Sequence, residues 1–191
     1  MTTQMTSKTI QQFVKEIGDQ HHVLAGTVIA TSAAQAAALG EACMQISLDH
    51  QVDSLDWQDV TTRIGQMVHL KNRLLEGADQ AAALMAEVEN GPSNQISAEV
   101  LRTVFEIPAE VTRLCLAGVF ALQAFRPLVL NHLAGNLTIA VRLLLGGAEA
   151  ALLLLQTELT RWEASGPADG YGAVLAELNS QVARVRAAGL D

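Results

Sequence analysis

The chain has 191 residues, a formal net charge of −8 and a pI of about 5.0. A chain this acidic, with scattered basic residues, is poorly suited to the phosphate backbone, so we expect no nucleic-acid partner. Half of the residues are hydrophobic but only 4% are aromatic, which favours closely packed helices over a β-sandwich or barrel.

Apolar residues recur at helical spacing from the start of the chain. Residues 10–17 carry four apolar side chains on one face and predict a short amphipathic helix. Residues 25–48 predict a helix of mostly small residues that has no charge before Glu41. Small residues let neighbouring helices approach closely, so we place this helix in the middle of a bundle.

Two longer helices follow. Residues 55–89 predict a helix that the turn at 90–92, Asn-Gly-Pro, stops. Residues 97–124 predict the next helix, and Pro108 within it is expected to kink or divide it because proline lacks the backbone N–H. Pro127 marks a further break in the chain.

The most apolar segment, residues 133–163, predicts a buried helix, and residues 174–185 predict a terminal amphipathic helix. The apolar run is long enough to cross a membrane, but Asn136, Arg142 and Glu149 interrupt it, so we expect no membrane partner. No segment alternates with the period of a strand. The predicted fold is therefore all-α, a single-domain up-and-down helical bundle over residues 1–191.

The cysteines and the amino terminus indicate the compartment. Cys43 and Cys115 form no metal-binding or redox motif, and the polar start of the chain lacks the features of a signal peptide. We interpret the cysteines as buried, reduced thiols of a cytoplasmic protein. The chain also has no zinc-protease motif and no Cys/His array, so no metal site is predicted.

Several stretches carry a resemblance to a known family. They are "TIQQFVKEI", "AGTVIATSAAQAAALGEA", "RLLEGADQAAALMAEV", "EIPAEVTRLC" and "AEAALLLLQTEL", in this order over residues 9–160. They resemble the cyclodeaminase part of formiminotransferase-cyclodeaminase and the stand-alone methenyltetrahydrofolate cyclohydrolases. The resemblance implies a helical bundle, a homodimer, a small-molecule substrate and acid/base chemistry on a folate, without a cofactor.

The positions that match the family's motifs have changed in this chain. The family's glycine-rich loop, Pro-Thr-Pro-Gly-Gly-Gly-Ser, falls on residues 21–27, where both prolines are absent and only Gly26 remains of the glycines. The second aspartate of the family's Asp-x-Asp-Ala motif is Gln80, and a Ser-Asp pair falls on Gly135 and Asn136. Amides cannot carry a proton near neutral pH, so a folate is a doubtful ligand and the usual folate reactions are not expected.

The candidate site residues follow from these positions. His21 and His22 occupy the loop, and an imidazole exchanges protons near neutral pH, so one of them is a candidate catalyst; the alternative is two solvated loop residues. His132 is a third candidate catalyst. The candidate substrate-binding residues are Gly26, Thr27, Asp79, Gln80, Asn131, Asn136, Arg142 and Glu149.

Three functions remain open. The first is a diverged enzyme that forms a ring or eliminates ammonia or water from a small molecule, in a specialised biosynthesis. The second is an inactive paralogue that binds a ligand or a partner protein, and the third is a folate enzyme with a variant site. Convergence of the loop histidines with His132 and Asn136 on one cleft would favour the first.

Overall fold

A computed structural model of the protein describes residues 4–19, 24–50, 57–90, 96–163 and 166–189. The described residues are almost entirely helical and include no strand, as the sequence predicts. The α-helices, joined in part by short 3-10 turns, are α1 (Ile10–Asp19), α2 (Ala25–His50), α3 (Trp57–Asn90), α4 (Ala98–Phe125), α5 (Ala134–Arg161) and α6 (Tyr171–Ala187).

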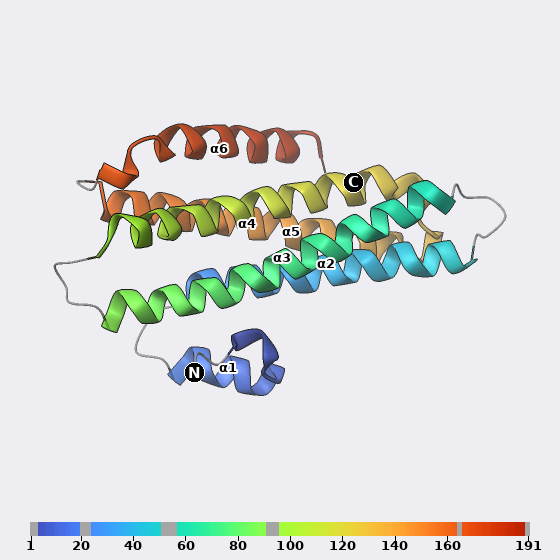
Figure 1. The fold of residues 1–191 in the computed structure, drawn as a ribbon. Coiled ribbons are helices and arrows are strands. Elements are labelled where there is room, and N and C mark those ends of the chain that lie inside the picture. Colours follow the sequence, from blue (N-terminus) through green and yellow to red (C-terminus); the bar gives the residue numbers. More distant parts are fainter. Residues whose placement is uncertain (1–3, 20–23, 51–56, 91–95, 164–165, 190–191) are drawn as a thin grey trace.

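Four long helices build the bundle (Figure 1). Helices α2 to α5 run alternately up and down, each packs on the next, and α2 also packs on α5, which closes the ring. Helix α6 packs along α4 and α5. Helix α1 lies beside the bundle, and Ile10 and Val14 on its apolar face remain 76% and 62% exposed.

Small residues bring the long helices close together, as the composition of α2 predicts. A Cβ atom added at Gly40 of α2 would lie 2.6 Å from Leu122 of α4, and one added at Gly118 of α4 would lie 2.9 Å from Leu144 of α5. Both leucines are fully buried. Glycine at these two positions therefore makes room for a leucine from the facing helix.

Pro108 was expected to kink or divide its helix; α4 passes through Pro108 undivided, so the division does not occur. A proline inside a helix loses one backbone hydrogen bond, but Pro108 is buried between neighbouring helices, whose packing supports the continuous helix. The Thr112 hydroxyl donates to the Pro108 carbonyl at 2.8 Å, which satisfies a buried polar group in the same turn.

Helix α5 corrects a second expectation, because it is buried on one side only. Ile139, Leu143 and Leu153 are 50%, 53% and 65% exposed. Residues 131–161 are long and apolar enough to cross a membrane by length and composition, yet α5 packs against α2, α4 and α6 as a member of the bundle.

Candidate functional site

The first turn of α2 meets α3 at the positions of two family motifs. A Cβ atom added at Gly26 would lie 3.1 Å from the Cβ of Ala81, so glycine permits this close approach. One residue later, the buried Thr27 hydroxyl donates to the Ala78 carbonyl at 3.1 Å. Thr27 was predicted to bind substrate, and this stays a prediction; in the structure its buried hydroxyl joins the two helices inside the core.

An apolar pocket of about 330 Å³ opens beside Gly26. Its walls come from the first turn of α2, the last turns of α3, the first half of α4 and the end of α5. At its rim, the Trp162 indole N–H donates to Glu158 at 3.2 Å, and the Arg161 guanidinium lies 5.2 Å from the indole centre. The pocket therefore combines an apolar interior with a charged edge, as small-molecule sites commonly do.

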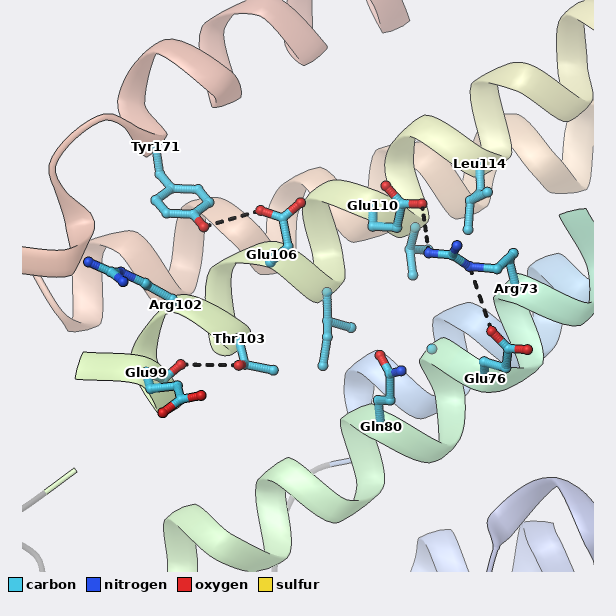
Figure 2. Close-up of a pocket in the computed structure, with 13 residues that line it drawn as sticks. Arg73, Glu76, Gln80, Glu99, Arg102, Thr103, Glu106, Glu110, Leu114 and Tyr171 are labelled. Carbon is cyan, nitrogen blue, oxygen red and sulfur yellow. Dashed lines mark hydrogen bonds and ion pairs between the residues drawn. The ribbon is translucent and has the colours of Figure 1, made fainter. Parts of the chain in front are cut away.

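A second, charged cleft of about 430 Å³ lies between α3 and α4 (Figure 2). Ile107 of α4 lines both this cleft and the apolar pocket, so the two hollows adjoin. Gln80 is exposed and lines the charged cleft, where the family would place an aspartate. The acidic side chains around it are Glu76, Glu99, Glu106 and Glu110.

Arginines pair with most of these carboxylates. Arg73 of α3 lies 3.7 Å from Glu76 and 3.3 Å from Glu110, so it bridges the two walls of the cleft (Figure 2). Arg113 lies 3.1 Å from Glu106 and 3.6 Å from Glu110. All of these side chains are at least a third exposed, so water screens the pairs and each adds little stability.

Tyr171, at the start of α6, closes one end of the cleft (Figure 2). Its hydroxyl donates to Glu106 at 3.1 Å, and its ring packs on the buried Phe105 with centroids 5.2 Å apart. Burial raises the pKa of Tyr171, and the hydrogen bond and charge of Glu106 raise it further, while Arg102 and Arg113 partly oppose this. Tyr171 therefore stays protonated at neutral pH and can donate a hydrogen to an acceptor in the cleft.

Asp79 is directed away from Gln80, its neighbour in sequence. Its carboxylate accepts hydrogen bonds from the Thr6 amide at 3.0 Å and the Thr6 hydroxyl at 2.6 Å. These bonds join α3 to the 3-10 turn Met5–Ser7, whose Met5 side chain is buried. Asp79 was predicted to bind substrate, and this stays a prediction; in the structure its carboxylate holds the amino-terminal turn against α3.

Asn131, His132 and Asn136 lie at the opposite end of the bundle from Gly26. All three side chains are exposed, and the adjacent Leu130 amide donates to Ser47 near the end of α2. None of them provides a side-chain cap for α5. Because α5 is 28 residues long, about 40 Å separates its two ends. Within one chain, the structure does not bring these residues to Gly26 or Gln80.

The remaining predicted residues are placed only in part. Arg142 and Glu149 lie on the side of α5 away from the core, and Glu149 pairs with Arg186 of α6 at 3.3 Å. His21 and His22 lie outside the described residues, so their predicted roles stay predictions. Among the residues that the structure describes, no group of three or more His, Cys, Asp or Glu side chains could hold a metal ion.

Most residues of the charged cleft were not predicted from the sequence. Glu99, Arg102, Glu106, Glu110 and Arg113 recur at spacings of three and four along α4. This spacing places them along one side of the helix, so a polar stripe in an otherwise apolar segment is the sequence signal for this side of the cleft. Arg73 and Tyr171 reach the cleft from other helices, so their place in it depends on how α3 and α6 pack against α4.

Comparison with known proteins identifies the scaffold. The family model of formiminotransferase-cyclodeaminase matches residues 9–165. The chain belongs to the formiminotransferase-cyclodeaminase family. A comparison of this family member with curated proteins found no match. The matched range covers α1 to α5 of the bundle, and Tyr171 and α6 lie beyond its end. In this member of the family, a helix outside the matched range therefore supplies Tyr171, which closes one end of the charged cleft.

Proposed function

We propose that the protein is a diverged enzyme of the formiminotransferase-cyclodeaminase family that uses acid/base chemistry on a small molecule. The reaction class is ring formation or elimination of ammonia or water. The substrate binds at the end of the bundle where the apolar pocket and the charged cleft adjoin. The observation that carries the proposal is the Tyr171–Glu106 hydrogen bond in the cleft that also contains Gln80.

The chemistry requires one group that accepts a proton and one that delivers it. Glu106 is a carboxylate whose oxygen accepts from Tyr171, so it suits the acceptor role. Tyr171 is protonated at neutral pH and suits the donor role. These groups line the same cleft as Gln80 and would replace proton carriers that the family motif has lost here. His21 and His22 remain candidates for a further proton transfer, and both lie outside the described residues.

The test begins with a thermal-shift screen of folates and cyclic amine precursors, followed by turnover assays of each stabilising compound. Glu106→Gln and Tyr171→Phe should each reduce turnover about a hundredfold or more without loss of folding. The matched control is Glu177→Gln, because Glu177 is an exposed carboxylate of α6, outside the cleft, that accepts a hydrogen bond from Gln181. Full turnover in both cleft variants would show that Glu106 and Tyr171 do not carry the proton transfers.

The alternative is a protein that binds a ligand or a partner without turning it over. The pairing of Glu76, Glu106 and Glu110 with arginines favours it, because carboxylates already paired with cations are weaker bases. In that case a compound would stabilise the protein in the screen and survive prolonged incubation unchanged. The buried and reduced cysteines fit a cytoplasmic location for either function.

A further inference from the structure

The charges of the cleft between α3 and α4 are matched along most of its length. Arg73 pairs with Glu76 and with Glu110, so it joins the two walls. Arg113 pairs with Glu106 and again with Glu110. These side chains form one continuous network in which each carboxylate already has an opposite charge beside it.

Two opposite charges near Tyr171 stand outside this network. Among the residues that the structure describes, neither the Glu99 carboxylate nor the Arg102 guanidinium has an ion-pair partner. Both side chains are exposed and line the cleft, about one turn apart on α4 (Figure 2). The adjacent Thr103 hydroxyl already donates to the Glu99 carbonyl at 3.1 Å. This end of the cleft therefore offers one negative and one positive group to a ligand.

The apolar pocket lies on the adjoining side of α4. Thr103 and Val104 are neighbours in sequence, yet the first lines the cleft and the second lines the pocket. Ile107, about one turn later, lines both hollows. A rise of about 1.5 Å per residue places Ile107 about 7–8 Å from Arg102 along the helix axis. A compact molecule can therefore touch the two charges and the apolar pocket at the same time.

The pocket suits an uncharged group. Among the described residues that line it, the charged ones pair with each other, because Glu158 accepts from the Trp162 indole at 3.2 Å and lies 4.0 Å from the Arg161 guanidinium. A charge placed in the apolar interior would lose water without gaining a partner, which is costly. A cavity of about 150 Å³ holds a benzene molecule. The pocket of about 330 Å³ therefore has room for an aromatic ring or a branched alkyl group.

We propose that the site binds an apolar α-amino acid as its zwitterion. Arg102 binds the carboxylate, Glu99 binds the ammonium group, and the apolar side chain enters the pocket beside Gly26. Residues three apart on a helix have Cβ atoms about 5–6 Å apart, so these two long side chains can converge on one carbon that carries both charges. A ligand with a single charge would leave one of the two unmatched. That this zwitterion is the substrate rests on the proposed function; that it binds does not.

The first test removes one charge of the ligand at a time. Isothermal titration calorimetry compares L-phenylalanine with 2-phenylethylamine, which lacks the carboxylate, and with 3-phenylpropanoate, which lacks the ammonium group. L-Phenylalanine should bind at least about tenfold more tightly than either, because only it makes both charged contacts. Equal affinity for the three compounds would overturn the proposal. So would a failure of both L-phenylalanine and L-leucine to bind at concentrations up to about 10 mM.

The second test assigns each charge to a residue. Arg102→Gln should lower the affinity for L-phenylalanine to that for 2-phenylethylamine without weakening the amine, and Glu99→Gln should lower it to that for 3-phenylpropanoate without weakening the acid. The matched controls are Arg184→Gln and Glu177→Gln, which remove the same charges from exposed positions of α6 outside both hollows. They should bind all three compounds as wild type does. An unchanged affinity for L-phenylalanine in either cleft variant would overturn the proposal.

The third test concerns the apolar side chain. L-Leucine and L-asparagine are similar in shape, and L-leucine should bind at least about tenfold more tightly, because the polar amide gains no partner in the pocket. Val88→Trp narrows the pocket from a partly exposed position of α3 and should weaken L-phenylalanine about tenfold or more. The control is Ala83→Trp, an exposed position of α3 that lines neither hollow. Circular dichroism checks that both variants fold. Equal affinity of the two variants for L-phenylalanine would show that its ring binds elsewhere.

Binding and turnover separate this proposal from the proposed function. Amino-acid binding that follows the expected order of ligands and variants supports the zwitterion, whether or not any amino acid is turned over. Absence of turnover would then contradict only the catalytic roles of Glu106 and Tyr171. Conversely, turnover of another compound that depends on Glu106 and Tyr171, by a protein that binds neither L-phenylalanine nor L-leucine, would overturn the zwitterion and leave the proposed function in place.

Discussion

Thr27 of α2 donates its hydroxyl hydrogen to the carbonyl of Ala78 in α3, 3.1 Å away and inside the core. The bond crosses from the helix that follows the glycine-rich loop position to the helix that carries the family's acidic motif. It fixes how α2 and α3 are aligned along their length, and with it the relative positions of Gly26 and Gln80. A polar residue in a buried helix thus serves to align two parts of the candidate site.

The variant Thr27→Val should lower the free energy of unfolding by about 1 kcal/mol, because it keeps the side-chain shape and removes one buried hydrogen bond. Urea unfolding followed by circular dichroism measures the change. The control is Thr62→Val, whose exposed hydroxyl donates to Gln58 within its own helix. Equal stability of Thr27→Val and wild type would show that this bond contributes nothing to the packing of α2.

Gly40→Ala should destabilise the protein by about 1–3 kcal/mol, because the added methyl group would overlap the fully buried Leu122. Gly65→Ala should stabilise the protein by up to about 1 kcal/mol, since the added methyl group meets no neighbour and alanine favours the helix. Thermal unfolding should show a lower melting temperature for Gly40→Ala and an equal or higher one for Gly65→Ala than for wild type. The double variant Gly40→Ala with Leu122→Ala should recover part of the loss if the overlap is its cause.

Asp79→Ala should release the amino-terminal turn without unfolding the bundle, because the two bonds from Thr6 are lost. The expected local cost is about 1–2 kcal/mol. Limited trypsin digestion should then cleave after Lys8 faster than in wild type, with the fragments identified by mass spectrometry. Gln80→Ala is the control, because Gln80 faces the charged cleft. Unchanged cleavage at Lys8 in Asp79→Ala would contradict the fastening role.

Alkaline pH should destabilise the protein through Cys115. Burial raises the pKa of its thiol from 9.0 to about 12. Above pH 9 the unfolded state loses this proton while the folded state keeps it, so stability is complete below pH 9 and falls toward pH 12, by about 1.4 kcal/mol per pH unit for this group. Urea midpoints at pH 8 and pH 10 should differ more for wild type than for Cys115→Ala. An equal pH dependence in the two proteins would show that other groups cause it.

The usual folate reactions should be nearly absent. Gln80 and Asn136 replace carboxylates of the family motif, and an amide cannot deliver a proton. Cyclodeaminase assays with formiminotetrahydrofolate should show negligible turnover, and cyclohydrolase assays with methenyltetrahydrofolate weak or no turnover. A rate near about 10 per second on either folate, a typical enzyme value, would show that the amides are no handicap.

The sequence by itself determined the helices and the family. Their apolar periodicity is local, so α2 to α6 begin and end close to where the pattern predicts, and the motif order over residues 9–160 agrees with the family match over 9–165. The small residues of α2 also predicted close packing, because a position with little or no side chain lets a neighbouring helix approach closely, whichever helix that is.

Only the tertiary structure decided which neighbours each side chain meets. Asp79 and Gln80 are adjacent in sequence, yet a rotation of about 100° per residue turns one toward Thr6 and the other into the charged cleft. Likewise, the composition of α5 predicted a buried helix, but only the placement of α2, α4 and α6 around it left one face uncovered. The sequence shows which side chains share a face of a helix. Whether that face is buried depends on which other helices pack against it, and this is decided only when the bundle assembles.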